Sequence, residues 1–163
     1  MSKIIATSKF THWQKAKKTA PIFAKHMRSV FSDISVAHRF LIDTIEGKEK
    51  VCIDAMLCQG SKGEYWQQTS INLFEHYNVT RINNSWLVCD PKSDYIVDVL
   101  EFYCEAEEEY YVQGLFGEDI PGIGTNLQRC LSGDYICRSR TDPADVWVVG
   151  KSYFENTHSI IWE

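Results

Sequence analysis

The sequence lacks the short motifs that mark most metal and catalytic sites. Its six cysteines include no pair with the CxxC spacing of zinc and redox sites, and no HExxH motif of a metalloprotease occurs. The five histidines are scattered without the spacing of metal ligands. From these absences we predict no bound metal, no cofactor and no catalytic residue that a motif identifies.

Long apolar runs are also missing. No run approaches the roughly 20 residues that a helix needs to cross a membrane, and the N-terminal residues contain no hydrophobic segment typical of an export signal. Several cysteines lie inside apolar runs, where a free thiol behaves as a small hydrophobic group. We therefore expect a cytoplasmic protein with free thiols and no membrane partner. The even number of cysteines leaves a disulfide framework as the alternative.

An excess of positive charge is absent as well. Lysine and arginine number 17 against 22 aspartates and glutamates, which gives a net charge of −5. A phosphate backbone attracts basic surfaces, so nucleic acid is disfavoured as a partner. The N-terminal part is basic and residues 105–109 are acidic, which we interpret as two solvated faces. An acidic patch that meets a basic partner is the alternative.

What the sequence does contain is typical of a folded globular protein. Hydrophobic residues make up 44% of the chain and charged residues 24%, and the aromatic content of 13% argues against disorder. A length of 163 residues suits one domain or two small units packed together.

A pattern of strand, turn, strand and short helix occurs twice in the chain. In the first copy Asp54 is followed 20 positions later by Phe74, and in the second Asp134 is followed 20 positions later by Phe154. We interpret this agreement as an internal repeat around which the chain is organised.

The repeat predicts an α+β fold made of two related, β-rich halves. Each half would be an antiparallel sheet, twisted or barrel-like, with a short helix. The Asn83-Asn84 turn is the boundary, so we assign residues 1–79 to the first repeat-like half and residues 80–163 to the second, as two units or as one compact domain. A duplicated unit buries one face against its twin, which would leave a cleft at the seam.

Local patterns predict the individual elements. We expect strands at residues 20–27, 40–44, 51–58, 65–68, 86–89, 95–103 and 110–113. We also expect a helix at 33–40, a short helix at 70–77 with Ser70 as its N-cap, and a long glycine-rich loop at 114–125.

Five segments carry a resemblance to known proteins. They are residues 18–24 (KTAPIFA), 44–47 (TIEG), 62–66 (KGEYW), 132–136 (SGDYI) and 154–158 (FENTH). Together they resemble a group of small phage and prophage proteins of unknown function. The pattern of that group is a Lys-Pro-rich strand, a TLEG turn, a GDYII strand, a KGEFY strand and a terminal FxxTY.

The chain departs from that pattern at two points. Residues 53–55 read Ile-Asp-Ala where the pattern has Gly-Asp-Tyr, and the second copy has no clear TLEG turn. The resemblance implies a fold and a mobile-element origin, but it brings no known chemistry.

Five residues are candidates for ligand binding. Arg138 and Arg140 alternate, so a strand would place both guanidinium groups on one face, where they could clamp a phosphate or carboxylate. Trp66 and Trp147 occupy the same position in the two copies and would either pack in the core or form a stacking platform. Asp134 follows a glycine at a strand start, where it would bond nearby backbone N–H groups or contact a ligand. We expect the two arginines and the two tryptophans near the seam.

The sequence therefore predicts a non-enzymatic binding protein of phage or mobile-element type. It would hold a small anionic ligand or a host protein at the seam, with inhibition of host defence as one use. One alternative is a small hydrolase or transferase with Cys58 as nucleophile and His76 as base. The other is a homo-oligomeric or structural interaction protein with an exposed aromatic patch.

Overall fold

The structure is a computed structural model that describes residues 2–31, 33–44, 47–105 and 108–162. Strands account for 52% of it and helices for 17%. The protein is therefore mostly β, with several antiparallel sheets and short helices, rather than an even α+β mixture. Residues 45–46 of the TIEG segment and 106–107 of the acidic run lie outside the described residues.

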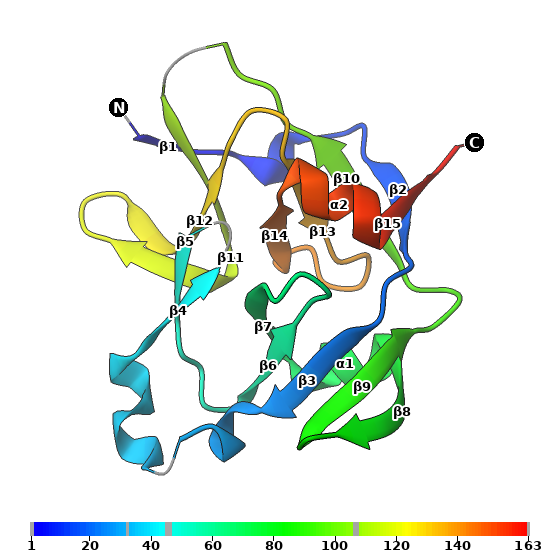
Figure 1. Ribbon diagram of the computed structural model, residues 1–163. Coiled ribbons are helices and arrows are strands. Elements are labelled where there is room, and N and C mark those ends of the chain that lie inside the picture. The colour runs from blue at the N-terminus through cyan, green and yellow to red at the C-terminus, as the bar shows by residue number, and fades with distance from the viewer. Residues whose placement is uncertain (1, 32, 45–46, 106–107, 163) are drawn as a thin grey trace.

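The elements follow one another as short strands with few helices (Figure 1). The strands are β1 (Ser2–Ile4), β2 (Gln14–Lys18), β3 (Ile22–His26), β4 (Leu41–Thr44), β5 (Gly47–Lys50), β6 (Ala55–Gln59), β7 (Tyr65–Thr69), β8 (Tyr77–Asn83), β9 (Trp86–Pro91), β10 (Ile96–Glu101), β11 (Glu109–Ile120), β12 (Gly124–Cys130), β13 (Tyr135–Arg138), β14 (Val146–Val149) and β15 (His158–Ile161). The α-helices are α1 (Ser70–His76) and α2 (Lys151–Thr157), and the 3-10 helices are η1 (Thr7–Lys9), η2 (Met27–Ser29) and η3 (Ile34–Arg39).

Two five-stranded antiparallel sheets form the body of the molecule. Their strand orders are β14-β13-β10-β2-β15 and β7-β6-β3-β9-β8. In each sheet the outer hairpin leads into a seven-residue helix, and the strand after the helix lies at the opposite edge. None of the sheets closes into a barrel within the described residues. Figure 1 shows β14 and β7, the edge strands of the two sheets, facing each other in the middle of the molecule.

Each of the two sheets also pairs strands across the predicted division of the chain. The early strand β2 pairs with β10 and β15, whereas the later strand β9 pairs with β3 and β8. A division between residues 79 and 80 would lie inside β8, and β9 would then leave the sheet in which it is hydrogen bonded. The main hydrophobic core accordingly draws on both sheets.

The other two sheets are a hairpin of β4 and β5 and a three-stranded sheet in which β1 runs parallel to β11. The β4–β5 hairpin contacts β7, and β11 contacts β14. Each hairpin therefore lies beside one of the facing edge strands.

Residues 114–125 form most of a long hairpin, so the prediction of a loop there is wrong. β11 and β12 pair antiparallel, with a register shift between Gln113 and Glu118. The glycines serve the bulge and the turn: Gly117 has φ +153° inside the shift, and Gly122 has φ +80° at the tip. Only glycine adopts such angles without strain, so a glycine-rich segment is compatible with a bulged hairpin.

The short helical segments also differ from the predictions in detail. The segment predicted as a helix at 33–40 is the 3-10 helix η3. The strand predicted at 51–58 begins later than expected, because residues 52–54 form a turn before β6. The N-cap of α1 is Thr69, whose Oγ1 accepts a hydrogen bond from the Asn72 backbone N–H at 3.1 Å, and Ser70 is the first helical residue. Both hydroxyl residues suit a cap, so local preference alone does not choose between them.

The equal spacing of the two copies does not correspond to equal places in the helices. Phe154 is 2% exposed and lies four residues after the N-cap Gly150. Four residues after the cap of α1 stands Leu73, which is fully buried, whereas Phe74 is 43% exposed. The aromatic side chain at position 74 therefore points outward, and leucine fills the core.

Candidate functional site

A cavity of about 130 Å³ lies where the edge strands β7 and β14 face each other. We call it the seam cavity. The linker between β2 and β3, the N-terminal part of α1, α2 and the start of β15 also contribute to its walls. The cavity thus combines side chains from both five-stranded sheets.

Aromatic side chains form much of the cavity wall. Trp66 in β7 and Trp147 in β14 both line it, together with Tyr153 from α2. Each tryptophan lies opposite a buried cysteine on its own hairpin, Cys58 for Trp66 and Cys137 for Trp147. The structure therefore brings the two tryptophans to one cavity, and both are partly buried against the main core.

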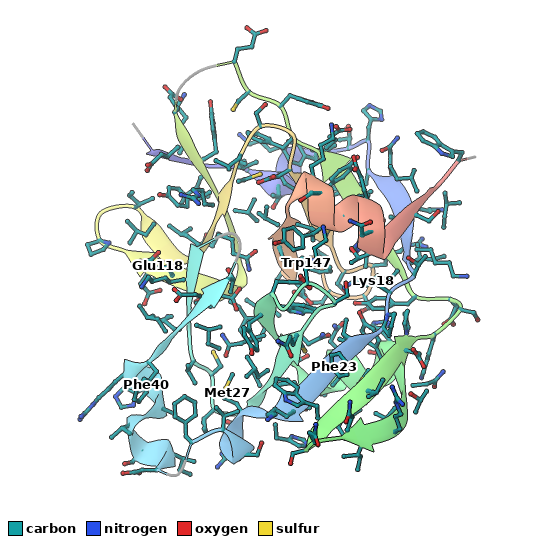
Figure 2. The ribbon with its side chains drawn as sticks, in the orientation of Figure 1. Lys18, Phe23, Met27, Phe40, Glu118 and Trp147 are labelled. Carbon is teal, nitrogen blue, oxygen red and sulfur yellow. The ribbon has the colours of Figure 1, made fainter. Side chains whose placement is uncertain are left out.

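Lys18 supplies a cation to this cavity. Its Nζ lies 5.0 Å from the ring centre of Tyr95, 5.3 Å from that of Trp147 and 6.0 Å from that of Tyr77. Lys18 and Trp147 are both labelled in Figure 2, between the two five-stranded sheets. Burial lowers the pKa of Lys18, but the oxygens of Tyr77 and Tyr95 outweigh this and the net direction is upward. The ammonium group is therefore charged, and within the described residues no carboxylate lies within 4.0 Å of it.

A buried carboxyl group, Glu49 of β5, lies at another wall of the cavity. Its two oxygens accept hydrogen bonds from Gln67 Nε2 at 3.3 Å and from Gln128 Nε2 at 3.4 Å. Both amides are held in place, because Gln67 Oε1 accepts from the Cys52 N–H at 2.8 Å and Gln128 Oε1 from the Val148 N–H at 2.9 Å. Glu49 is 3% exposed. Burial raises its pKa to about 7, against the opposite effect of the Gln67 hydrogen bonds.

His158 presents an unpaired nitrogen. The Thr157 hydroxyl donates to the Tyr153 carbonyl oxygen at 2.8 Å, so Thr157 Oγ1 must accept the proton from His158 Nδ1, which lies 2.7 Å away. Nε2 is then a lone-pair acceptor, and it is buried without a hydrogen-bond partner among the described residues. The ring stacks on Phe154 at 4.5 Å. Burial, and then the charge of Lys18, lowers the pKa of His158 to about 2, so the imidazole is neutral.

Two further carboxyl groups line the cavity. Glu64 folds over Gly60, where any Cβ would overlap Glu64 Oε1, and its Oε2 is buried without a partner among the described residues. For Asp145, burial followed by the nearby Asp142 raises the pKa to about 6, while the charge of Lys18 lowers it. Among the described residues, the cavity therefore combines one cation, Lys18, with several hydrogen-bond acceptors.

Arg138 and Arg140 lie outside the cavity lining. Arg138 lies directly opposite Asp98 in the β10–β13 ladder, and its Nη2 is 2.8 Å from Asp98 Oδ2. Its guanidinium group also lies 4.2 Å from the centre of the Trp13 ring. Arg140 Nε is 3.8 Å from Asp98 Oδ1. Both arginines approach Asp98, but β13 ends at Arg138, so Arg140 is not on the strand that the alternation requires. Neither arginine lines the cavity with Trp66 and Trp147.

Asp134 makes a local turn interaction. Its Oδ2 accepts a hydrogen bond from the Leu131 N–H at 2.9 Å, and it lies in a shallow surface depression beside α2. Asp54, which the repeat places in the same role, instead pairs with Arg28 at 2.6 Å. The two aspartates therefore do different things, and Asp134 does not line the seam cavity.

The thiol of Cys58, the predicted nucleophile, is not activated. All six are free. Cys58 is fully buried, and burial raises its pKa to about 12 despite the hydrogen bond from Gln68 Nε2 at 3.2 Å. His76 stacks on Tyr95 at 4.2 Å and is not bonded to Cys58. A nucleophilic cysteine needs a lowered pKa, so the geometry gives the Cys58–His76 pair no support.

The sequence did not single out Lys18, Glu49 or His158 as site residues. No short motif joins them, because they come from β2, β5 and β15. One signal was available: Tyr77 and His158 both follow a helix of the repeat directly, and both line the cavity.

Among the residues that the structure describes, no group of three or more His, Cys, Asp or Glu side chains is arranged to hold a metal ion. No helix in the described ranges has the length and apolar character to cross a membrane. Comparisons with protein families, with curated proteins and with solved structures find no match to this chain.

Proposed function

We propose that the protein is a binding protein that holds a small anionic molecule in the seam cavity without transforming it. One observation carries this proposal: the Lys18 ammonium group faces a cavity with aromatic walls and has no carboxylate within 4.0 Å in the described residues. A cation in a partly dehydrated site is costly without a counter-charge. An anionic ligand would supply that charge, and Trp66 and Trp147 would cover its apolar part.

Native mass spectrometry tests the proposal. The protein is purified from the organism that encodes it, and its native and denatured masses are compared. We expect an additional small-molecule mass that Lys18→Met abolishes and Lys17→Met retains, because Lys17 is the neighbour in β2 that does not line the cavity. A bound mass that survives Lys18→Met, or one that both variants lose equally, contradicts the proposal.

We further propose that the two halves arose from one duplicated unit of about 80 residues, the spacing between the two copies in the sequence. The matching order of hairpin, helix and edge strand in the two five-stranded sheets supports this. So does the paired placement of the β4–β5 and β11–β12 hairpins beside β7 and β14. In this view β2 and β9 have exchanged places between the units, and the seam cavity lies where the units meet.

The resemblance to phage proteins supports a role of this binding protein in a mobile element, in the cytoplasm, where inhibition of a host defence is one use. A second candidate is binding to a host protein or to another copy. It is favoured by Ile71 in α1 and Ile82 in the edge strand β8, which are 78% and 71% exposed. Light scattering at high protein concentration separates these cases, since a monomer contradicts self-association.

A further inference from the structure

The size of the seam cavity restricts the part of a ligand that it can enclose. Cavities that take drug-sized ligands have volumes of roughly 300–1,000 Å³, whereas an engineered cavity of about 150 Å³ takes one benzene molecule. The seam cavity, at about 130 Å³, belongs to the second class. A single aromatic ring fits both this volume and the aromatic walls.

The polar groups that lack partners restrict the chemistry of that ring. The amides of Gln67 and Gln128 are already bonded to Glu49 and to the backbone. The buried atoms without partners among the described residues are His158 Nε2 and Glu64 Oε2. Both accept hydrogen bonds, and buried acceptors left unpaired are costly.

Resting on the binding role proposed above, we infer that the seam cavity takes a pyrimidine-type heteroaromatic ring with an acidic substituent. Two ring N–H groups donate to His158 Nε2 and Glu64 Oε2, and the acidic group pairs with Lys18. The ring lies against the indoles of Trp66 and Trp147. A hydrocarbon ring leaves the two acceptors unpaired, and a neutral ring leaves Lys18 without a counter-charge.

Three probes separate these contributions on the unaltered protein. Orotate has the ring, two N–H groups and a carboxylate; uracil lacks the carboxylate; benzoate lacks the N–H groups. We expect orotate to bind at least about tenfold more tightly than either of the others, measured by calorimetry and by tryptophan fluorescence. Benzoate that binds as tightly as orotate overturns the inference.

Two variants give opposite patterns across the probes. Glu64→Leu should weaken orotate and uracil by about tenfold and should not weaken benzoate, because it removes an acceptor of a ring N–H. Lys18→Met should weaken orotate and benzoate and leave uracil unchanged. Glu155→Leu and Lys17→Met, which lie outside the cavity, are the matched controls. Uniform weakening of all three probes by either cavity variant contradicts the assigned contacts.

The outcome also separates this inference from the binding role itself. If none of the probes binds while native mass spectrometry shows a small molecule that depends on Lys18, the ring class is wrong and the binding role stands. If neither a probe nor a native small molecule binds, both are wrong. The probe comparison on the unaltered protein decides the ring class even where a variant is unstable.

Discussion

At the scale of single residues, Glu49 links the ionisation of the site to stability. Its pKa is about 7 in the folded protein and 4.5 in an ordinary environment. Between these values the folded state binds more protons than the unfolded state, so the free energy of unfolding falls as the pH rises from about 4.5 to about 7. A pKa shift of this size corresponds to a decrease of about 3 kcal/mol in the free energy of unfolding. The decrease is complete once the pH exceeds the pKa of Glu49 in the folded protein.

The variant Glu49→Gln should remove that fall, because a glutamine does not ionise. Urea denaturation at about pH 5 and about pH 8 gives the change in the free energy of unfolding between these pH values. We expect this change to be about 3 kcal/mol smaller in the variant than in the native protein. Glu155→Gln, on the exposed face of α2, should keep the native pH dependence. An unchanged pH dependence in Glu49→Gln shows that Glu49 is not the group responsible.

His158 should remain neutral far below the pH at which a solvated imidazole gains a proton. Burial lowers its pKa to about 2, and the hydrogen bond to Thr157 fixes the proton on Nδ1. Nitrogen NMR of the ring should therefore show an Nδ1–H tautomer at about pH 5. A doubly protonated His158 ring at that pH contradicts the assignment. Because the unfolded chain binds the proton more readily, His158 also lowers stability as the pH falls below its ordinary value of 6.5.

At the scale of elements, the long β11–β12 hairpin depends on one close approach. A Cβ at Gly114 would overlap the carbonyl oxygen of Val146 in β14, which is backbone and cannot move aside. Gly114→Ala should lower the free energy of unfolding by about 2 kcal/mol or more.

The matched control is Gly124→Ala in the same hairpin. There the nearest atoms belong to the side chains of Ile4 and Leu127, which can adjust, so we expect a loss below about 1 kcal/mol. Urea denaturation measures both values. Equal losses would show that the contact between β11 and β14 does not limit position 114.

Sequence patterns at this scale located most short elements but misjudged their limits. The strands predicted at 65–68 and 86–89 are confirmed as β7 and β9, and the one predicted at 20–27 is confirmed over its residues 22–26 as β3. Local preferences of β-branched and aromatic residues suffice to locate such strands. The glycine-rich segment was misread, since its pairing partner and the β14 backbone that it approaches are remote in the chain.

At the scale of the whole molecule, the pairing of β2 and β9 with strands from the other side of the β8–β9 turn should hold the two parts of the chain together. The β8–β9 turn is a tight one, with Asn84 and Ser85 at positive φ. A protease site inserted there can be cut without interrupting any strand. We expect the two fragments to elute together in size exclusion, because β9 remains paired with β3 and β8 and β2 with β10 and β15.

The uncut insertion variant is the control for this experiment, and circular dichroism reports whether the cut protein keeps its strands. Fragments that separate without denaturant contradict a fold held together by these strand pairings. Fragments that stay together agree with one shared core built from both sheets.

The sequence by itself determined the mostly local features: two strand–turn–strand–helix segments, the position of the paired tryptophans, and a chain without metal or catalytic motifs. Tertiary structure decided the features that depend on remote neighbours. Arg138 is paired with Asp98 because β13 lies beside β10, and Lys18, Glu49 and His158 meet because three distant strands end at one cavity. Side-chain type and spacing act over a few residues, whereas these contacts join segments that only the folded chain brings together.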